Sequence, residues 1–230
     1  MTHRQAPRTK LALRVTTLVI AAATVAACGA AEYTYVKNSD ERTYFKVPSA
    51  WHRVDQNALD DIFRSDHPDS AAAAIRAQMV WSIAYDADRR PSPQHLLTGD
   101  GDEPFVFATV RHLTDQQRDG ISFDTLRNAV MPVTEDARTS ALQAGVPLES
   151  FELLADEVVK PGSGIRGVHI VFNYRFAGHP ELNTFEQMAY LNDDTSRMYL
   201  MLVRCSAPCY RDRKSELHEI AQSFTVRSSS

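Results

Sequence analysis

The segment that most constrains the fold runs from residue 151 to residue 205. Four apolar stretches follow one another there, at 151–159, 166–176, 183–193 and 197–205, with only short polar turns between them. In the second stretch, Val168, Ile170, Phe172 and Tyr174 alternate with residues that are mostly polar. This period of two is typical of a β-strand with one apolar side. Because consecutive strands joined by short turns pair antiparallel, we predict an antiparallel sheet whose dry face is covered by helices.

The remaining elements complete a prediction of the α+β class, with a central antiparallel β-sheet flanked by helices. Further strands are predicted at 32–36, 42–48, 77–87 and 104–113, and helices at 55–65, 122–131, 134–145 and 208–224. Asp55 is a suitable N-cap for the first helix, and Pro208 fits the first turn of the last one. We therefore expect a single α+β domain over residues 33–227, followed by a short tail at 228–230.

The N-terminus has the pattern of an export signal. Residues 1–14 carry four basic side chains and no acidic one, and an apolar run follows from Val15 to Ala27. That run of 13 residues is shorter than the ~20 needed for a helix to cross a bilayer. A basic start, a short apolar middle and small residues at the end predict a signal peptide over residues 1–27. Since no Arg-Arg pair precedes the run, the general secretory route is favoured over the twin-arginine route.

The end of this leader, Val25-Ala26-Ala27-Cys28, resembles the bacterial lipobox. The resemblance implies a diacylglyceryl group on the Cys28 thiol, cleavage after Ala27, and further acylation, for example by palmitate, at the new amino terminus. Two or three acyl chains anchor a protein stably, because each buried methylene contributes about 0.8 kcal/mol. Residues 28–32 would then be a short tether to the extracytoplasmic face of the cell membrane. The alternative is an ordinary signal peptide with a chance cysteine.

The charge of the processed chain excludes one class of partner. Removal of residues 1–27 takes the formal net charge from −4 to −8. Nucleic acids require a basic face, so we expect no nucleic-acid partner. The acidity is also unsuited to electrostatic docking on anionic lipid, and its simplest role is solubility.

The order of elements is similar to that of the PsbP-like superfamily. The resemblance covers roughly residues 33–227 and is carried by "YFKVPSAW", "FEQMAYLNDDTSRMYLMLVRCSAP" and the closing "EIAQSFTV". This superfamily includes extrinsic photosystem II proteins, Ran-binding relatives and actinobacterial lipoproteins of the LpqN type. The resemblance implies a PsbP-like α/β/α sandwich with a binding or scaffolding role and no catalysis. No functional motif aligns, so no ligand position is carried over.

Two cysteines in "RCSAPC" form the sharpest candidate for chemistry. Cys205 and Cys209 lie four residues apart, at a predicted strand end and helix start. Outside the cytoplasm such a pair is oxidised, and a tight turn brings the Cα atoms into disulfide range, so we predict a structural disulfide. The alternative is a copper or thiol-redox site, because thiolates suit Cu(I) and Met198 and Met201 lie nearby.

The remaining motifs give weaker evidence for a functional site. The G-x-G-x-x-G of residues 162–167 precedes a strand where a dinucleotide site requires a helix, so it is predicted to be a glycine-rich hairpin. His169 lies on the second side of its strand and is expected to be packed or hydrogen-bonded rather than to bind a metal. The histidines show no ligand spacing, and no nucleophile elbow is present. We assign no catalytic residue, no metal site and no cofactor.

Taken together, these features predict a lipid-anchored, extracytoplasmic lipoprotein. Its domain is expected to bind or scaffold an envelope protein or a small ligand without catalysis, through an open sheet edge or a cleft. An envelope hydrolase and a copper or thiol-redox lipoprotein that uses Cys205 and Cys209 are the alternatives.

Overall fold

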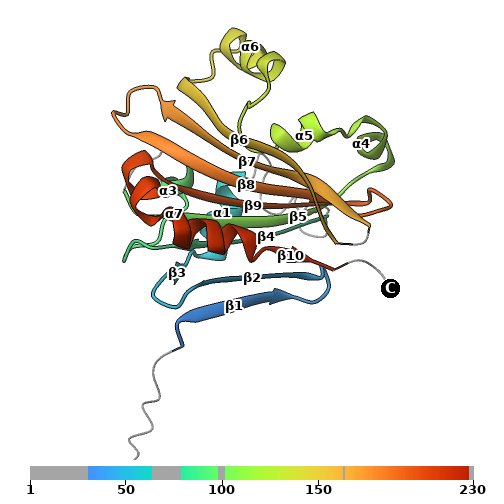
Figure 1. Cartoon of the computed structure of the whole chain (residues 1–230), viewed down its shortest axis with the longest axis horizontal. Helices are drawn as coiled ribbons and strands as arrows, with labels where there is room; N and C mark the ends of the chain where they lie inside the picture. The colour runs from blue at the N-terminus through green and yellow to red at the C-terminus, as the bar shows by residue number, and fades with distance from the viewer. Residues whose placement is uncertain (1–30, 64–78, 98–101, 163, 228–230) are drawn as a thin grey trace, which may run out of the picture. The chain divides into compact units, whose positions relative to one another are not determined.

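A seven-stranded antiparallel sheet forms the centre of the computed structural model, which describes residues 31–63, 79–97, 102–162 and 164–227. The strands lie in the order β3-β4-β5-β9-β8-β7-β6 (Figure 1). Their bounds are β3 His52–Arg53, β4 Val80–Asp86, β5 Phe105–His112, β6 Leu148–Gly162, β7 Ile165–Phe176, β8 Leu182–Leu191 and β9 Arg197–Ser206. The predicted α+β class with a central antiparallel sheet is confirmed.

Strands β6 to β9 form a meander of four long neighbours, as the four apolar stretches predict. The glycine-rich stretch at 162–167 closes the β6–β7 hairpin, in which Gly162 pairs with Ile165, so the hairpin interpretation is confirmed. Gly164 has φ +71°, a left-handed conformation that favours glycine. A Cβ at Gly167 would lie 2.0 Å from the backbone oxygen of Ala189, so glycine also permits the close approach of β7 to β8.

The sheet has two covered faces. The first, called here the α7 face, lies beneath helix α7 (Ala207–Gln222), which packs on β8 and β9 (Figure 1). A second antiparallel sheet, β1-β2-β10, joins the same core. Its strands are β1 Tyr33–Asn38, β2 Thr43–Pro48 and β10 Thr225–Val226.

The other face, called here the phenylalanine face, contains Phe172 and Phe185. Leu59, Leu96 and Leu126 pack in the same core, and they come from three helices. These helices are α1 Gln56–Phe63, α3 Gln94–Leu97 and α5 Phe123–Arg127. Two more helices, α4 Asp115–Gly120 and α6 Glu135–Gln143, contain no buried residue.

The prediction of a single dry face for the sheet is wrong, because both sides of β7 are buried. Val168, Ile170 and Phe172 lie on the phenylalanine face as predicted. On the α7 face, the polar side chains of His169 and Asn173 are buried as well, and each is hydrogen-bonded. Burial of polar groups is tolerated there because partners are supplied within the fold.

Helix α7 begins and bends at defined residues. The Ser206 side chain accepts a hydrogen bond from the Cys209 amide at 3.3 Å, and Pro208 lies in the first turn, as predicted. Arg213 has non-helical angles (φ −112°, ψ 17°), which kink the helix in its middle. Beyond the kink, Leu217, Ile220 and Ala221 are fully buried and fix the second half of α7 on the sheet.

Candidate functional site

A buried carboxylate lies at the centre of the α7 face. The side chain of Glu186, on β8, has no exposed surface. Its Oε1 atom lies 2.9 Å from Nε2 of His169 on β7 and 2.6 Å from Nδ1 of His218 on α7. Its Oε2 atom accepts a hydrogen bond of 2.8 Å from the Tyr210 hydroxyl. Both oxygens of Glu186 are therefore engaged, by groups from two strands and a helix.

The elements bring these groups together for local reasons. Alternation along β7 and β8 places His169 and Glu186 on the same side of the sheet, diagonal to each other across adjacent strands. Tyr210 lies before the kink of α7 and His218 after it, and the burial of Leu217 beside His218 presses that part of the helix onto the sheet. The cluster thus depends on the docking of α7.

The electrostatics of the cluster favour a charged Glu186. Burial opposes ionisation, but hydrogen bonds from His169, His218 and Tyr210 outweigh it, and the pKa of the Glu186 carboxyl is lowered. Burial and the adjacent carboxylate raise the pKa of the Tyr210 hydroxyl, so this group stays protonated and donates. A buried anion is tolerated here because three partners surround it.

Each histidine also has a second polar neighbour. Nδ1 of His169 lies 4.0 Å from a carboxylate oxygen of Glu157 on β6, and Nε2 of His218 lies 2.7 Å from Nε2 of Gln222. The two imidazole rings are 5.6 Å apart between centroids. One donor atom from each of His169, Glu186 and His218 can be chosen so that all three lie within 4.8 Å of one another. Of the described residues, these three form the group with the donors and spacing to hold a metal ion.

Sequence reasoning did not find this cluster. His169 is hydrogen-bonded, as expected. Its partner Glu186 lies 17 residues further along the chain, and His218 lies 32 residues beyond Glu186, so no local motif contains the cluster. One signal was available: Glu186 is a charged residue in the middle of a strand, followed on the same side by the apolar Met188 and Tyr190. A carboxylate in such a position requires a partner, so it predicts a buried polar contact.

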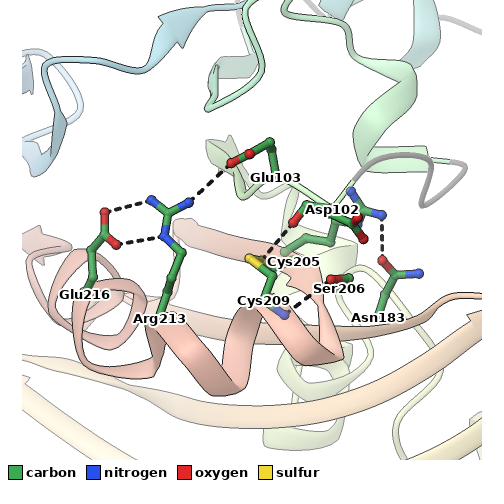
Figure 2. The surroundings of a disulfide bond; sticks show 9 residues. Asp102, Glu103, Asn183, Cys205, Ser206, Cys209, Arg213 and Glu216 are labelled. Carbon is green, nitrogen blue, oxygen red and sulfur yellow. Dashed lines mark hydrogen bonds and ion pairs between the residues drawn. A yellow bond between two sulfur atoms is a disulfide. The ribbon is translucent and has the colours of Figure 1, made fainter.

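Cys205, at the end of β9, and Cys209, in the first turn of α7, form a disulfide with a Cα–Cα distance of 5.9 Å (Figure 2). This agrees with the predicted structural role. The Cys205 sulfur lies 3.4 Å from the carbonyl oxygen of Asp102. Since both sulfurs are in the disulfide, the pair offers no thiolate to Cu(I).

The surroundings of the disulfide do not assemble a copper site either. Met198 belongs to the core of the phenylalanine face and Met201 to that of the α7 face, so the two side chains lie on opposite sides of β9. Arg213, four residues after Cys209 on α7, forms ion pairs with Glu216 and Glu103 (Figure 2). The contact with Glu103 links α7 to the segment before β5, and the contact with Glu216 lies within the helix.

The second candidate feature is the exposed edge of the sheet. Strand β6 is the last strand in the order and pairs only with β7 among the described strands. Large apolar side chains are exposed along β6 and around the C-terminal end of helix α6, which precedes it. Their accessible fractions are 40–77%, and they are Leu142, Val146, Leu153, Leu154 and Val158. Among the described residues, Tyr35 is the only other large apolar side chain with comparable exposure. Such gathering is typical of an interaction surface.

The same strand is acidic. Glu149, Glu152, Asp156 and Glu157 are exposed along β6. Three of them already contact polar neighbours: Glu149 pairs with Arg175, Glu152 accepts from Asn173, and Asp156 pairs with Arg127. The register shifts at three points along β6, which reveals bulges in an edge strand.

The predicted lipidation site cannot be placed. The lipobox residues Val25, Ala26, Ala27 and Cys28 lie outside the described residues. Within the described part of the chain, every helix is too short or too polar to cross a membrane.

No family model matches the chain, and no curated protein matches it in sequence. Similar solved structures include the PsbP of Synechocystis sp. PCC 6803 (12% identity, 87% of this chain and 96% of that one, TM-score 0.48). The Ran-binding protein Mog1p of Saccharomyces cerevisiae is 9% identical over 85% of this chain and 96% of its own, with a TM-score of 0.41. LpqN of Mycobacterium tuberculosis, which is involved in cell envelope biogenesis, is 12% identical over 84% and 89%, with a TM-score of 0.42. Likeness at this level carries no information about function.

Proposed function

We propose that the chain is a lipoprotein, anchored by acyl groups on Cys28 at the extracytoplasmic face of the cell membrane, whose domain binds an envelope protein. The anchor rests on the basic leader, the short apolar run and the Val25–Cys28 sequence. The disulfide between Cys205 and Cys209 supports an oxidising compartment outside the cytoplasm.

The binding role rests on the edge strand β6. An edge strand presents unpaired backbone donors and acceptors, which an extended segment of another protein can pair with. Exposed Leu153, Leu154 and Val158 supply apolar contacts, and Glu152 and Glu157 supply negative charge. We therefore propose that the partner adds a strand to β6 and carries both apolar and basic side chains.

The anchor is tested by replacement of Cys28. In the native host, the wild-type chain should fractionate with membranes, and mass spectrometry should find an acylated cysteine at its amino terminus. Cys28→Ala should leave the chain unacylated and release it from the membrane. An intact leader or an unmodified Cys28 thiol in the native protein would overturn the anchor.

The edge is tested by site-specific photo-crosslinking in cells. A photoreactive residue at Val158 should capture one reproducible envelope protein, whereas one at the exposed Arg211 on α7 should not. A peptide that spans the captured site should protect the β6 amides from hydrogen exchange, and Leu153→Asp should remove that protection. Crosslinking of the chain to a second copy of itself, or equal capture at Arg211, would contradict the proposal.

A further inference from the structure

The buried cluster on the α7 face has the composition of a metal centre. We propose that His169, Glu186 and His218 bind a Zn²⁺ ion. The three ligands belong neither to the Cys28 anchor nor to the β6 edge, which contributes only Glu157 as an outer neighbour of His169, so loss of Zn²⁺ binding and loss of the partner are separate outcomes.

The donor atoms select the class of ion. Two imidazole nitrogens and one carboxylate oxygen are a common set for Zn²⁺ with an open fourth position. Mg²⁺ and Ca²⁺ prefer oxygen donors alone, and Cu(I) prefers sulfur. The sulfurs of Cys205 and Cys209 are in a disulfide, so they do not compete as ligands.

The distances from Glu186 to the two histidines fit with small adjustments, and the ligand nitrogens of the two rings lie within 4.8 Å of each other. Ligand atoms ~2.0–2.1 Å from a tetrahedral Zn²⁺ lie about 3.3 Å from one another. In the structure, Glu186 Oε1 lies 2.9 Å from His169 Nε2 and 2.6 Å from His218 Nδ1. An ion between them requires these contacts to open by about half an ångström. Zn²⁺ binding requires the two ring nitrogens that now face the carboxylate to be free of protons, so in each neutral ring the proton moves from that nitrogen to the outer one.

The outer nitrogens already have polar neighbours that suit this arrangement. Nδ1 of His169 faces the Glu157 carboxylate at 4.0 Å, and Nε2 of His218 lies 2.7 Å from the Gln222 side-chain amide, whose oxygen can face the ring after a flip. The Tyr210 hydroxyl holds the second oxygen of Glu186. Metal-binding histidines typically donate their other N–H to such groups, which orient the ring.

The cluster also has an entry side. Glu186 is fully buried and His169 is nearly so, but the His218 side chain is 37% exposed. An ion can therefore reach the cluster along α7, and a water molecule can supply the fourth ligand there. A cluster closed to solvent would have neither feature.

The test is Zn²⁺ titration of the purified full-length chain after chelator treatment, in competition with a chromogenic chelator. One ion should bind per chain and raise the melting temperature. His218→Ala, a change at a partly exposed position, and Glu186→Gln should each weaken Zn²⁺ binding by more than the ~10–100-fold that loss of an outer contact costs. His52→Ala, an exposed histidine on β3, is the matched control and should bind as the wild type does.

Two further readouts separate ligation from folding. Co²⁺ in place of Zn²⁺ should show visible absorption bands in the wild type and lose them in His218→Ala, while far-ultraviolet circular dichroism shows both proteins folded. Gln222→Ala should weaken binding about 10-fold and keep the bands. Absence of stoichiometric Zn²⁺ binding by the folded wild type, or unchanged affinity in folded His218→Ala, would overturn the site.

Discussion

The two faces of the central sheet come from the same strands but are held by different interactions. On the phenylalanine face, the rings of Phe172 and Phe185 stack with centroids 5.4 Å apart and planes within 15°. On the α7 face, the next residue of β8, Glu186, is bound by two histidines and a tyrosine, and a disulfide joins β9 to α7. An apolar ring needs only to be covered, whereas a buried carboxylate needs donors placed in specific directions. The α7 face therefore specifies the position of its helix more closely.

The largest effect is expected on the phenylalanine face. Phe172→Ala should lower the free energy of unfolding by about 3–5 kcal/mol, because it removes a fully buried ring and leaves a cavity beside Phe185. Urea unfolding followed by circular dichroism measures this. Leu154→Ala, at an exposed position on β6, is the control and should change stability by less than ~0.5 kcal/mol. A cost below about 1 kcal/mol for Phe172→Ala would show that this face is loosely packed.

The covalent link of the α7 face should contribute an intermediate amount. Replacement of both Cys205 and Cys209 by alanine should lower the free energy of unfolding by about 2 kcal/mol, the value expected for closure of a short loop. The measurement compares unfolding of the wild type and the double variant with and without a thiol reductant. The reductant should destabilise only the wild type. Equal free energies of unfolding for the two proteins without reductant would contradict a structural role for the disulfide.

The smallest effect is expected from a single hydrogen bond in the polar cluster. Tyr210→Phe keeps the ring but removes one of the donors to Glu186, and should cost about 1.5 kcal/mol. Tyr35→Phe, at a position that is 78% exposed, should leave stability unchanged. Equal unfolding midpoints for the two variants in urea would contradict a contribution of the Tyr210 hydroxyl to stability.

The strands of the meander were largely predictable because their signal is local. β7 was predicted at 166–176 and spans Ile165–Phe176, since alternation is strong where one side is apolar. β6 was predicted at 151–159 but spans Leu148–Gly162, because an edge strand with bulges and exposed charges weakens the alternation at its ends. The two-residue strands β3 and β10 were missed, as two residues carry no periodicity.

The sequence alone determined the class of fold, the antiparallel pairing of the four meander strands, the cysteine pair and the hypothesis of a lipidated leader, because each depends on residues close together in the chain. Only the tertiary structure decided that the second side of the sheet is buried and that His169, Glu186 and His218 meet. Strand alternation assigns each side chain to a side of the sheet, but it does not say which helix covers that side. The position of α7 follows from burial of its apolar residues against β8 and β9, an interaction between segments that no local pattern encodes.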